Sequence, residues 1–317
     1  MGTKLFSITD ETQWLEIRKK YVTSTESAAL FGASKWLTPF ELWHIKRGNI
    51  SGDLKDNNFL RFGRLVEAPI VEMVKIEHPD WTVSPMRVFA YDEEYRMGSS
   101  FDRIVKLDDG RVGTMEVKSI SYAQYKKDFI EHTPDDIEAS MQYEIQIQHQ
   151  LEILDKYDFC LLVVFIADTR TLKYIFRDRD LDVGKSLRAA IKKFWDMEDP
   201  PEPDFTMDKG IIAKLAPTAN PDNVMDATGN HRISELCAMY RAEKDLEKQS
   251  KDNADAFYAE LMTLIGDARY CWTHDYKITA TDVKPNAGKA ITPEMVGQTT
   301  GARAGYKKLT ITPQKGE

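Results

Sequence analysis

The stretch from Gly98 to Ser119, GSSFDRIVKLDDGRVGTMEVKS, constrains the fold most because it is typical of a β-hairpin. Its two arms, residues 101–107 and 111–117, are rich in β-branched and apolar side chains. The DDG sequence at residues 108–110 supplies turn residues between them. The rest of the chain is therefore expected to build a sheet around this hairpin.

The hairpin places three reactive side chains on one face. A loop centred on Asp109 puts Asp102 directly opposite Glu116, and directly opposed residues have Cβ atoms roughly 5 Å apart. Because strand side chains alternate, Lys118 shares the face of Glu116. One face is therefore expected to gather two carboxylates and an ammonium group.

Two facing carboxylates repel each other unless a cation lies between them, and a hard divalent cation such as Mg²⁺ prefers oxygen ligands. A lysine beside them can hold or activate an attacking water. This combination suits metal-assisted phosphodiester hydrolysis. The pattern is short, and an ordinary solvated hairpin with surface ion pairs explains it equally well when it is taken alone.

Length and charge limit the class of protein. The 317 residues suit one large domain, or a main domain with an appendage. With 43 Lys and Arg against 51 Asp and Glu, the formal net charge is −8, so any DNA contact requires local basic patches. Three scattered cysteines form no CxxC pair, which argues against structural zinc or an iron–sulfur cluster. With no signal peptide and no membrane span, the protein is expected in the cytoplasm.

The first 50 residues predict three short helices, which begin after Asp10, Thr23 and Thr38. The hydroxyls of residues 23–25 lie near Arg18 at a helix start, where free N–H groups offer a phosphate site. Alternatively, these hydroxyls merely cap the helix, which is commoner for an isolated STE stretch.

A longer helix is expected from Asn58 to Glu77, followed by a strand from Trp81 to Tyr91. Glu67 lies in the middle of this helix, either as a solvated charge or as a third carboxylate directed at a metal. The candidates for the buried side of the helix are Phe59, Phe62, Leu65, Val66, Ile70, Met73, Val74 and Ile76.

After the hairpin we expect a short helix over residues 122–130 and a longer one from Thr133 to about Leu154. The longer helix carries four glutamines, of which Gln146 or Gln148 is positioned to hold a water or a phosphate oxygen. Either could equally bond only to its neighbours. The apolar run DFCLLVVFIA at 158–167 predicts a strand buried on both faces.

A strand over residues 171–177 and a helix from Asp180 to about Met197 complete an α/β (α+β) core, in which helices flank a central mixed sheet. Three prolines then mark a break. We therefore predict a core over residues 1–200, a linker without clear periodicity over 201–231 and a C-terminal module over 232–317. The module is expected to contain a charged helix or helical hairpin over 232–266, and strands over 270–280 and 306–311.

Five segments also carry a family resemblance. In chain order they are VTSTESAALFG, FGRLVE, SSFD, MEVKS and YEIQIQ. Together they resemble the motifs of the YqaJ-type phage recombinase exonucleases, the lambda-exonuclease branch of the PD-(D/E)XK nuclease superfamily, over roughly the first 200 residues. Two positions depart from the pattern, because Phe101 replaces the proline of the S-P-D motif and Thr25 stands where lambda exonuclease has serine.

The resemblance implies a PD-(D/E)XK core and assigns roles to residues. Asp102, Glu116 and the backbone carbonyl of Val117 would bind catalytic Mg²⁺, for which Mn²⁺ would substitute. Lys118 would act on the nucleophilic water. The remaining implied site residues are Glu67 in the acidic cluster, Gln146 at the water or metal, and Arg18, Thr25 and Ser100 at the 5′-phosphate of the DNA.

The resemblance further implies an activity. Such enzymes digest one strand of linear double-stranded DNA processively from its 5′ end, as a homotrimer ring in a bacterial host cell. They leave 3′ single-stranded tails for a single-strand annealing protein in phage-type recombination. Two alternatives remain: an endonuclease on the same scaffold, or a catalytically inert module that binds DNA ends or a partner through the charged C-terminal helix.

Overall fold

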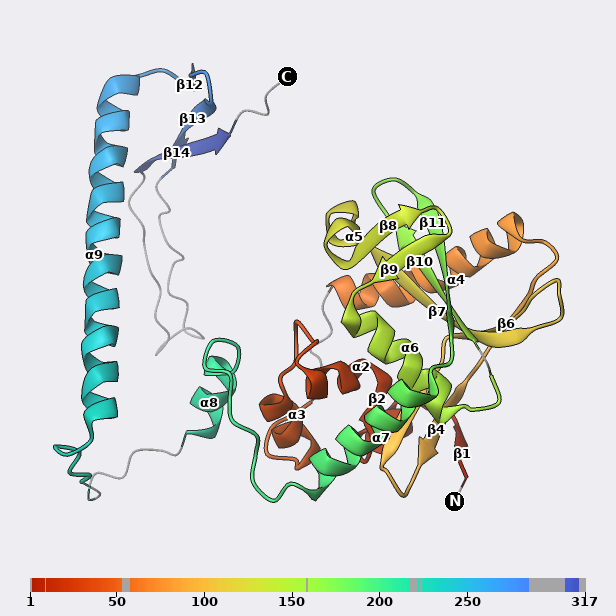
Figure 1. The fold of residues 1–317 in the computed structure, drawn as a ribbon. Coiled ribbons are helices and arrows are strands. Elements are labelled where there is room, and N and C mark those ends of the chain that lie inside the picture. Colours follow the sequence, from red (N-terminus) through yellow and green to blue (C-terminus); the bar gives the residue numbers. More distant parts are fainter. Residues whose placement is uncertain are drawn as a thin grey trace, which may run out of the picture. The chain divides into compact units, whose positions relative to one another are not determined.

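A computed structural model describes residues 2–8, 10–52, 58–157, 159–216, 222, 224–284 and 306–313. The chain divides into two compact units, Met1–Thr218 and Ala219–Glu317 (Figure 1), and each is described by itself.

The first unit is built around a five-stranded mixed sheet with the strand order β11-β10-β7-β6-β3. Its strands are β3 (Thr82–Pro85), β6 (Arg103–Lys106), β7 (Val112–Ile120), β10 (Phe159–Ile166) and β11 (Thr171–Asp178). The central pair β7 and β10 is parallel, and the other neighbours are antiparallel. The expected mixed sheet is therefore confirmed, and β10 is buried on both faces as its apolar run predicts.

Helices cover both faces of this sheet. On one face, α4 (Asn58–Glu77) packs Ile70 and Val74 against Met115 of β7. On the other face, α6 (Met141–Ile153) packs Ile147 and Leu151 with residues of β10 such as Leu162. Because β7 alternates between these two faces, Glu116 and Lys118 lie on the α6 side and Met115 and Val117 on the α4 side.

A second, four-stranded sheet lies in the same unit, with the order β1-β4-β5-β2. It contains β1 (Lys4–Ser7), β2 (Val22–Thr23), β4 (Val88–Asp92) and β5 (Met97–Ser100). His149 of α6 is buried and its Nε2 lies 3.0 Å from the carbonyl oxygen of Gly98 in β5. The helix that covers the central sheet is thereby also tied to the second one.

The three predicted helix starts near the N-terminus are confirmed. Asp10 accepts a hydrogen bond from the Thr12 amide before α1 (Glu11–Lys19). Thr23 forms a capping box with Glu26 at α2 (Ser24–Ser27), which continues into the 3₁₀ helix η1 (Ala28–Phe31). Thr38 accepts the Glu41 amide at the start of α3 (Pro39–Lys46).

Other helices and strands of the first unit are shorter. They are α5 (Tyr122–Asp128), β8 (Phe129–Thr133), β9 (Asp136–Ala139), α7 (Leu181–Asp196) and α8 (Lys209–Leu215). Asp180 caps α7 as expected, by accepting the amides of Asp182 and Val183.

Three predicted elements were wrong. The single strand expected over residues 81–91 is two strands in different sheets, β3 and β4. The helix expected from Thr133 begins only after Ser140, because residues 136–139 alternate between exposed and buried and pair with β8. The stretch 205–230 is not uniformly irregular, since it contains α8, and buried Asp208 before it accepts a hydrogen bond from Thr38.

The predicted buried side of α4 was too wide. Phe62, Leu65 and Ile76 are 50%, 67% and 79% exposed, because the stripe that packs on the sheet is narrower and centres on Ile70 and Val74. The side chain of Phe59 lies outside the described residues.

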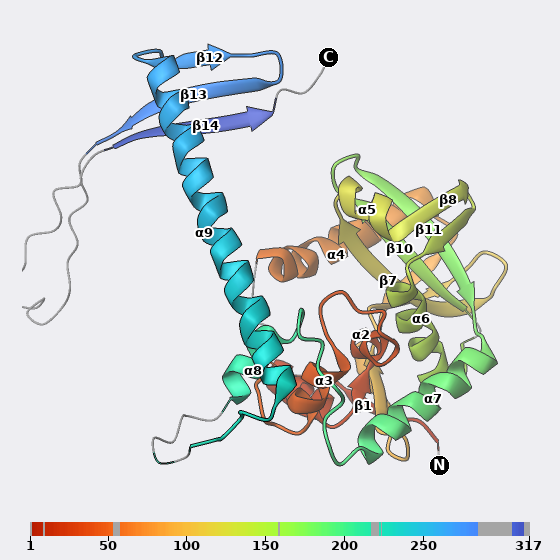
Figure 2. The ribbon, with the colours of Figure 1, turned by 60° about the vertical axis from the view of Figure 1, so that its left-hand side comes forward.

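The second unit begins with α9 (His231–Ile265), a single helix of 35 residues. Its last turns pack on a three-stranded antiparallel sheet of β12 (Tyr270–Trp272), β13 (Tyr276–Val283) and β14 (Tyr306–Pro313) (Figure 2). The strand expected over residues 270–280 is interrupted by a turn at 273–275. In the described part of the chain, no helix has both the length and the apolar character needed to cross a membrane.

Candidate metal and phosphate site

The hairpin has the predicted register, but its ladder stops one residue short of the candidate site. Arg103 pairs with Met115 and Lys106 with Val112, as a loop centred on Asp109 requires. Asp102 lies in the break between β5 and β6, where its Oδ2 accepts the backbone N–H of Val117 at 3.0 Å. Asp102 is therefore held beside Glu116 by a carboxylate–backbone bond and not by a ladder pair.

Both carboxylate oxygens of Glu116 are held by side-chain donors. Oε1 accepts from Lys118 Nζ at 2.6 Å and from Gln146 Nε2 at 2.6 Å. Oε2 accepts from Gln150 Nε2 at 2.7 Å. Glu116 is 6% exposed. These contacts fix the orientation of a buried carboxylate.

The structure distinguishes between the glutamines of α6. Gln146 faces Glu116, whereas Gln148 donates to the carbonyl of Asp178 and accepts from the amide of Asp180. Sequence reasoning assigned no role to Gln150. Its spacing of four residues from Gln146 was the available signal, because residues i and i+4 lie on the same face of a helix.

The electrostatics of the site show an excess of negative charge. Burial, followed by the nearby charges of Glu116 and Glu67, raises the pKa of Asp102 to about 8 against the opposing effect of Lys118. Burial alone would lower the pKa of Lys118, yet Glu116 and Asp102 outweigh it and the pKa is raised. Both shifts indicate a place where an added cation is stabilised.

Glu67 lies beside this cluster but is already paired. Its carboxylate forms an ion pair with Arg103 Nη1 at 2.7 Å, and Arg103 also donates to the backbone carbonyl of Asp102 at 2.7 Å. Glu67 therefore reaches the site chiefly through its charge and through Arg103.

The donor set fits a magnesium ion. Within the described ranges no group of three or more His, Cys, Asp or Glu converges as a metal cage. Mg²⁺, however, usually keeps several waters and takes only one or two carboxylates plus substrate phosphate. The N–H of Val117 points to Asp102, and a strand residue directs its N–H and C=O to the same edge. The Val117 carbonyl therefore lies at the same edge, beyond the last β6 pair.

The residues expected at the 5′-phosphate lie partly together. The guanidinium of Arg18 lies over the Trp14 ring, 4.6 Å from its centroid, and the Trp14 indole N–H donates to Ser100 Oγ at 2.7 Å. Trp14 thus joins Arg18 to Ser100, two residues before Asp102.

Thr25 occupies the adjoining helix start. It is exposed, and its Oγ1 lies 3.2 Å from Thr23 Oγ1. The neighbouring Glu26 pairs with Lys46 at 2.7 Å, and Lys46 also donates to the Arg18 carbonyl at 3.0 Å. The Arg18 and Lys46 charges help to lower the pKa of Glu26 against the effect of its burial. Lys46 of α3 thus links Glu26 of α2 to the end of α1.

Fold and site together define an α/β domain with an acidic, lysine-containing centre on the central strand β7 of a mixed sheet. Residues 13–156 match the model of the YqaJ-like viral recombinase domain family. The resemblance to the YqaJ-type family that was drawn from the motifs is therefore confirmed over these residues.

The individual proteins that resemble this chain have low sequence identity to it. The uncharacterized protein YqaJ of Bacillus subtilis is 23% identical over 273 residues, which cover 82% of this chain and 82% of the relative. The crystal structure of the alkaline exonuclease LHK-Exo from Laribacter hongkongensis is 18% identical, covers 58% of this chain and 90% of its own, and has a TM-score of 0.46. A phage-related exonuclease from Haemophilus somnus is 14% identical over 56% of this chain and 93% of its own, with a TM-score of 0.40.

Proposed function

We propose that the protein is a Mg²⁺-dependent, processive 5′-to-3′ exonuclease on linear double-stranded DNA, which leaves 3′ single-stranded tails for recombination by strand annealing. The observation that supports this best is the convergence of Asp102, Glu116, Lys118 and Gln146 at one buried, negatively charged centre.

Each residue has a role in the proposed reaction. Asp102, Glu116 and the Val117 carbonyl hold the divalent cation, and Gln146 and Gln150 keep the Glu116 carboxylate in position. When bound, the cation polarises the scissile phosphate and lowers the pKa of a bound water. Lys118, already hydrogen-bonded to Glu116, orients the attacking water. Mn²⁺ is expected to substitute for Mg²⁺, since it accepts similar oxygen ligands.

The end of the DNA is held by the neighbouring cluster. Arg18 and Ser100, joined by Trp14, and the hydroxyl of Thr25 at a helix start offer donors to a terminal 5′-phosphate. This cluster adjoins the catalytic centre through the chain segment between Ser100 and Asp102, so a bound end places the first phosphodiester near the metal ligands. From the family resemblance we also propose a homotrimer ring, an annealing protein as partner and a cytoplasmic location.

The test compares substrates and metals. Purified protein is given linear duplex with a 5′-phosphate or a 5′-hydroxyl, and closed circular duplex, in Mg²⁺ or in EDTA. We expect digestion only of linear duplex in Mg²⁺, fastest with the 5′-phosphate, and release of mononucleotides from the 5′ end. Digestion that ignores ends or persists in EDTA would refute the proposal, and cutting of the circle would identify an endonuclease.

Variants of the two carboxylates test the site itself. Asp102→Ala and Glu116→Ala are expected to abolish cleavage while duplex binding in EDTA persists, because they remove metal ligands and leave the phosphate cluster intact. Asp109→Ala is the matched control, because this aspartate lies at the exposed tip of the hairpin, where its carboxylate contacts the neighbouring Arg111. Cleavage at the wild-type rate in either ligand variant would contradict the assignment.

A further inference from the structure

The small sheet of the second unit has one covered face and one open face. Ile278 and Ala280 of β13 are 5% and 9% exposed and pack against α9 through Leu261 and Met262. Cys271 of β12 packs on the same side. Because side chains alternate along a strand, Tyr270, Trp272 and Lys277 lie on the opposite side. We call this second side, defined by Tyr270, Trp272, Lys277 and Thr279, the outer face.

Two large aromatic side chains stand on the outer face without being buried. Tyr270 is 43% exposed and Trp272 is 61% exposed. Their ring centroids are 5.7 Å apart and the rings are tilted by 31°. They lie two residues apart on one strand, so their spacing approximates that of successive bases in an extended single strand. The arrangement provides two π-surfaces side by side.

Cationic groups lie at the same two rings. Lys277 Nζ is 5.6 Å from the Tyr270 centroid and 5.9 Å from the Trp272 centroid. The Arg269 guanidinium is 5.4 Å from the Tyr270 centroid. The Lys277 ammonium is therefore about equally distant from both rings. If a base stacks on each ring, the phosphate that joins the two bases would lie near this ammonium.

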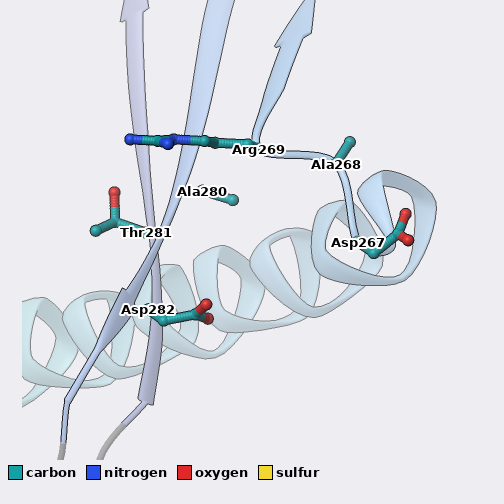
Figure 3. A pocket seen from close by; sticks show the side chains of 6 residues that line it. All are labelled: Asp267, Ala268, Arg269, Ala280, Thr281 and Asp282. Atoms are coloured by element: carbon teal, nitrogen blue, oxygen red, sulfur yellow. The ribbon is translucent and has the colours of Figure 1, made fainter.

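The charge of this part of the chain differs from that of the whole. Residues 267–317 contain eight Lys and Arg against five Asp and Glu, whereas the full chain has a net charge of −8. Two of those acids, Asp267 and Asp282, line a hollow of about 460 Å³ with Arg269 and Thr281 (Figure 3). Asp282 lies near the end of β13, whereas Lys277 lies near its start and pairs with Trp272.

We propose that the outer face binds single-stranded DNA, with Tyr270 and Trp272 each stacking on a base and with Lys277 and Arg269 meeting the phosphates. Stacking on exposed aromatics beside cations is how proteins hold single strands without reading their sequence. An apolar protein partner would instead remove the Lys277 and Arg269 charges from water without compensation. The inference stands without the proposed nuclease activity, although that activity would supply single strands as its product.

The experiment measures the binding of full-length protein to a fluorescent oligothymidine of about 20 nucleotides, long enough for one such site. Fluorescence anisotropy is recorded in EDTA, which prevents cleavage, and the oligonucleotide carries a 5′-hydroxyl, which avoids the phosphate cluster of the first unit. Tyr270→Ala and Trp272→Ala are each expected to weaken binding by about tenfold or more, whereas Tyr270→Phe and Trp272→Phe retain a ring and stay within about threefold of wild type.

Matched controls come from α9 of the same unit. Tyr240 and Phe257 are 67% and 66% exposed, so Tyr240→Ala and Phe257→Ala remove similar aromatic surface away from the sheet and should leave the affinity unchanged. Circular dichroism melts establish that each variant is folded. The phenylalanine variants keep an aromatic ring at the same position, so they distinguish loss of stacking from loss of structure.

Several results would overturn the inference. They are equal affinity of wild type and both alanine variants, an equal loss in the α9 controls, an equal loss in the phenylalanine variants, or binding of a protein in place of DNA at the same side chains. Failure of the nuclease proposal has a different readout, the digestion of duplex in Mg²⁺, so the two are distinguishable.

Discussion

The carboxyl group of Asp102 combines burial with two acidic neighbours, and its pKa is raised to about 8. In the metal-free protein it is therefore mostly protonated at neutral pH, and a cation that binds must displace the proton. We expect the apparent affinity for Mg²⁺ to rise about tenfold per pH unit below pH 8 and to level off above it. Isothermal titration calorimetry in two buffers of different ionisation enthalpy would measure the released proton.

The raised pKa of Asp102 also makes the stability of the metal-free protein depend on pH, and this stability falls as the pH rises. A carboxyl whose folded pKa lies above its unfolded value contributes stability that is lost as the pH rises through the folded pKa. The contribution of Asp102 to the melting temperature in EDTA should therefore decline between about pH 4 and about pH 8 and level off above that, and Asp102→Asn should reduce this decline. An unchanged slope in the variant, or metal binding without proton release, would contradict the assignment.

Gln150 is a positioning residue, because its side chain holds the Glu116 carboxylate in place. Gln150→Ala removes the donor to Oε2, and partners of metal ligands typically account for 10- to 100-fold in metal affinity or activity. We expect cleavage to fall by about that factor, with most of the loss recovered at high Mg²⁺. Gln148→Ala is the matched control from the same helix, because among the described residues the Gln148 side chain bonds to Asp178 and Asp180 and not to Glu116. Equal losses in the two variants would point to damage of α6 instead.

At the scale of elements, the pairing of β7 with β10 brings the backbone at Gly113 very close to Phe159. A Cβ added at Gly113 would lie 2.5 Å from the Phe159 ring and 2.6 Å from the Phe159 carbonyl oxygen. The backbone oxygen has no room to yield, so we expect Gly113→Ala to lower the free energy of unfolding by about 1–3 kcal/mol. Urea denaturation followed by tryptophan fluorescence measures the change. Gly210→Ala in α8 meets no atom within 4 Å and should not destabilise the protein.

The elements that sequence predicted correctly are those fixed by local chemistry. Capping residues such as Asp10 and Thr38 determine where helices begin, and the DDG turn determines the hairpin register. Sequence reasoning missed what tertiary packing decides. The division of residues 81–91 between two sheets depends on which neighbours each half meets, and the rotation of α6 alone brings Gln146 and not Gln148 to Glu116.

At the scale of the whole molecule, all proposed metal ligands and their supports belong to the first unit. A bound ion stabilises the unit that holds it. Hydrogen exchange followed by mass spectrometry should therefore show slower exchange in peptides of β7 and α6 when Mg²⁺ is added, with peptides of α9 unchanged. Asp102→Asn should remove the effect. Equal slowing in residues 231–265 would show that the ion acts elsewhere.

The parallel pairing of β7 and β10 also determines when the site is completed during synthesis. Parallel neighbours require a crossover, and here the crossover contains α6 with Gln146 and Gln150. A nascent chain that ends after the hairpin already contains Asp102, Glu116 and Lys118, but it lacks both α6 and β10, the strand on which α6 packs. The proposed catalytic centre therefore cannot form until about residue 166 has left the ribosome, so shorter translation products should carry the acidic motif without the proposed cleavage activity.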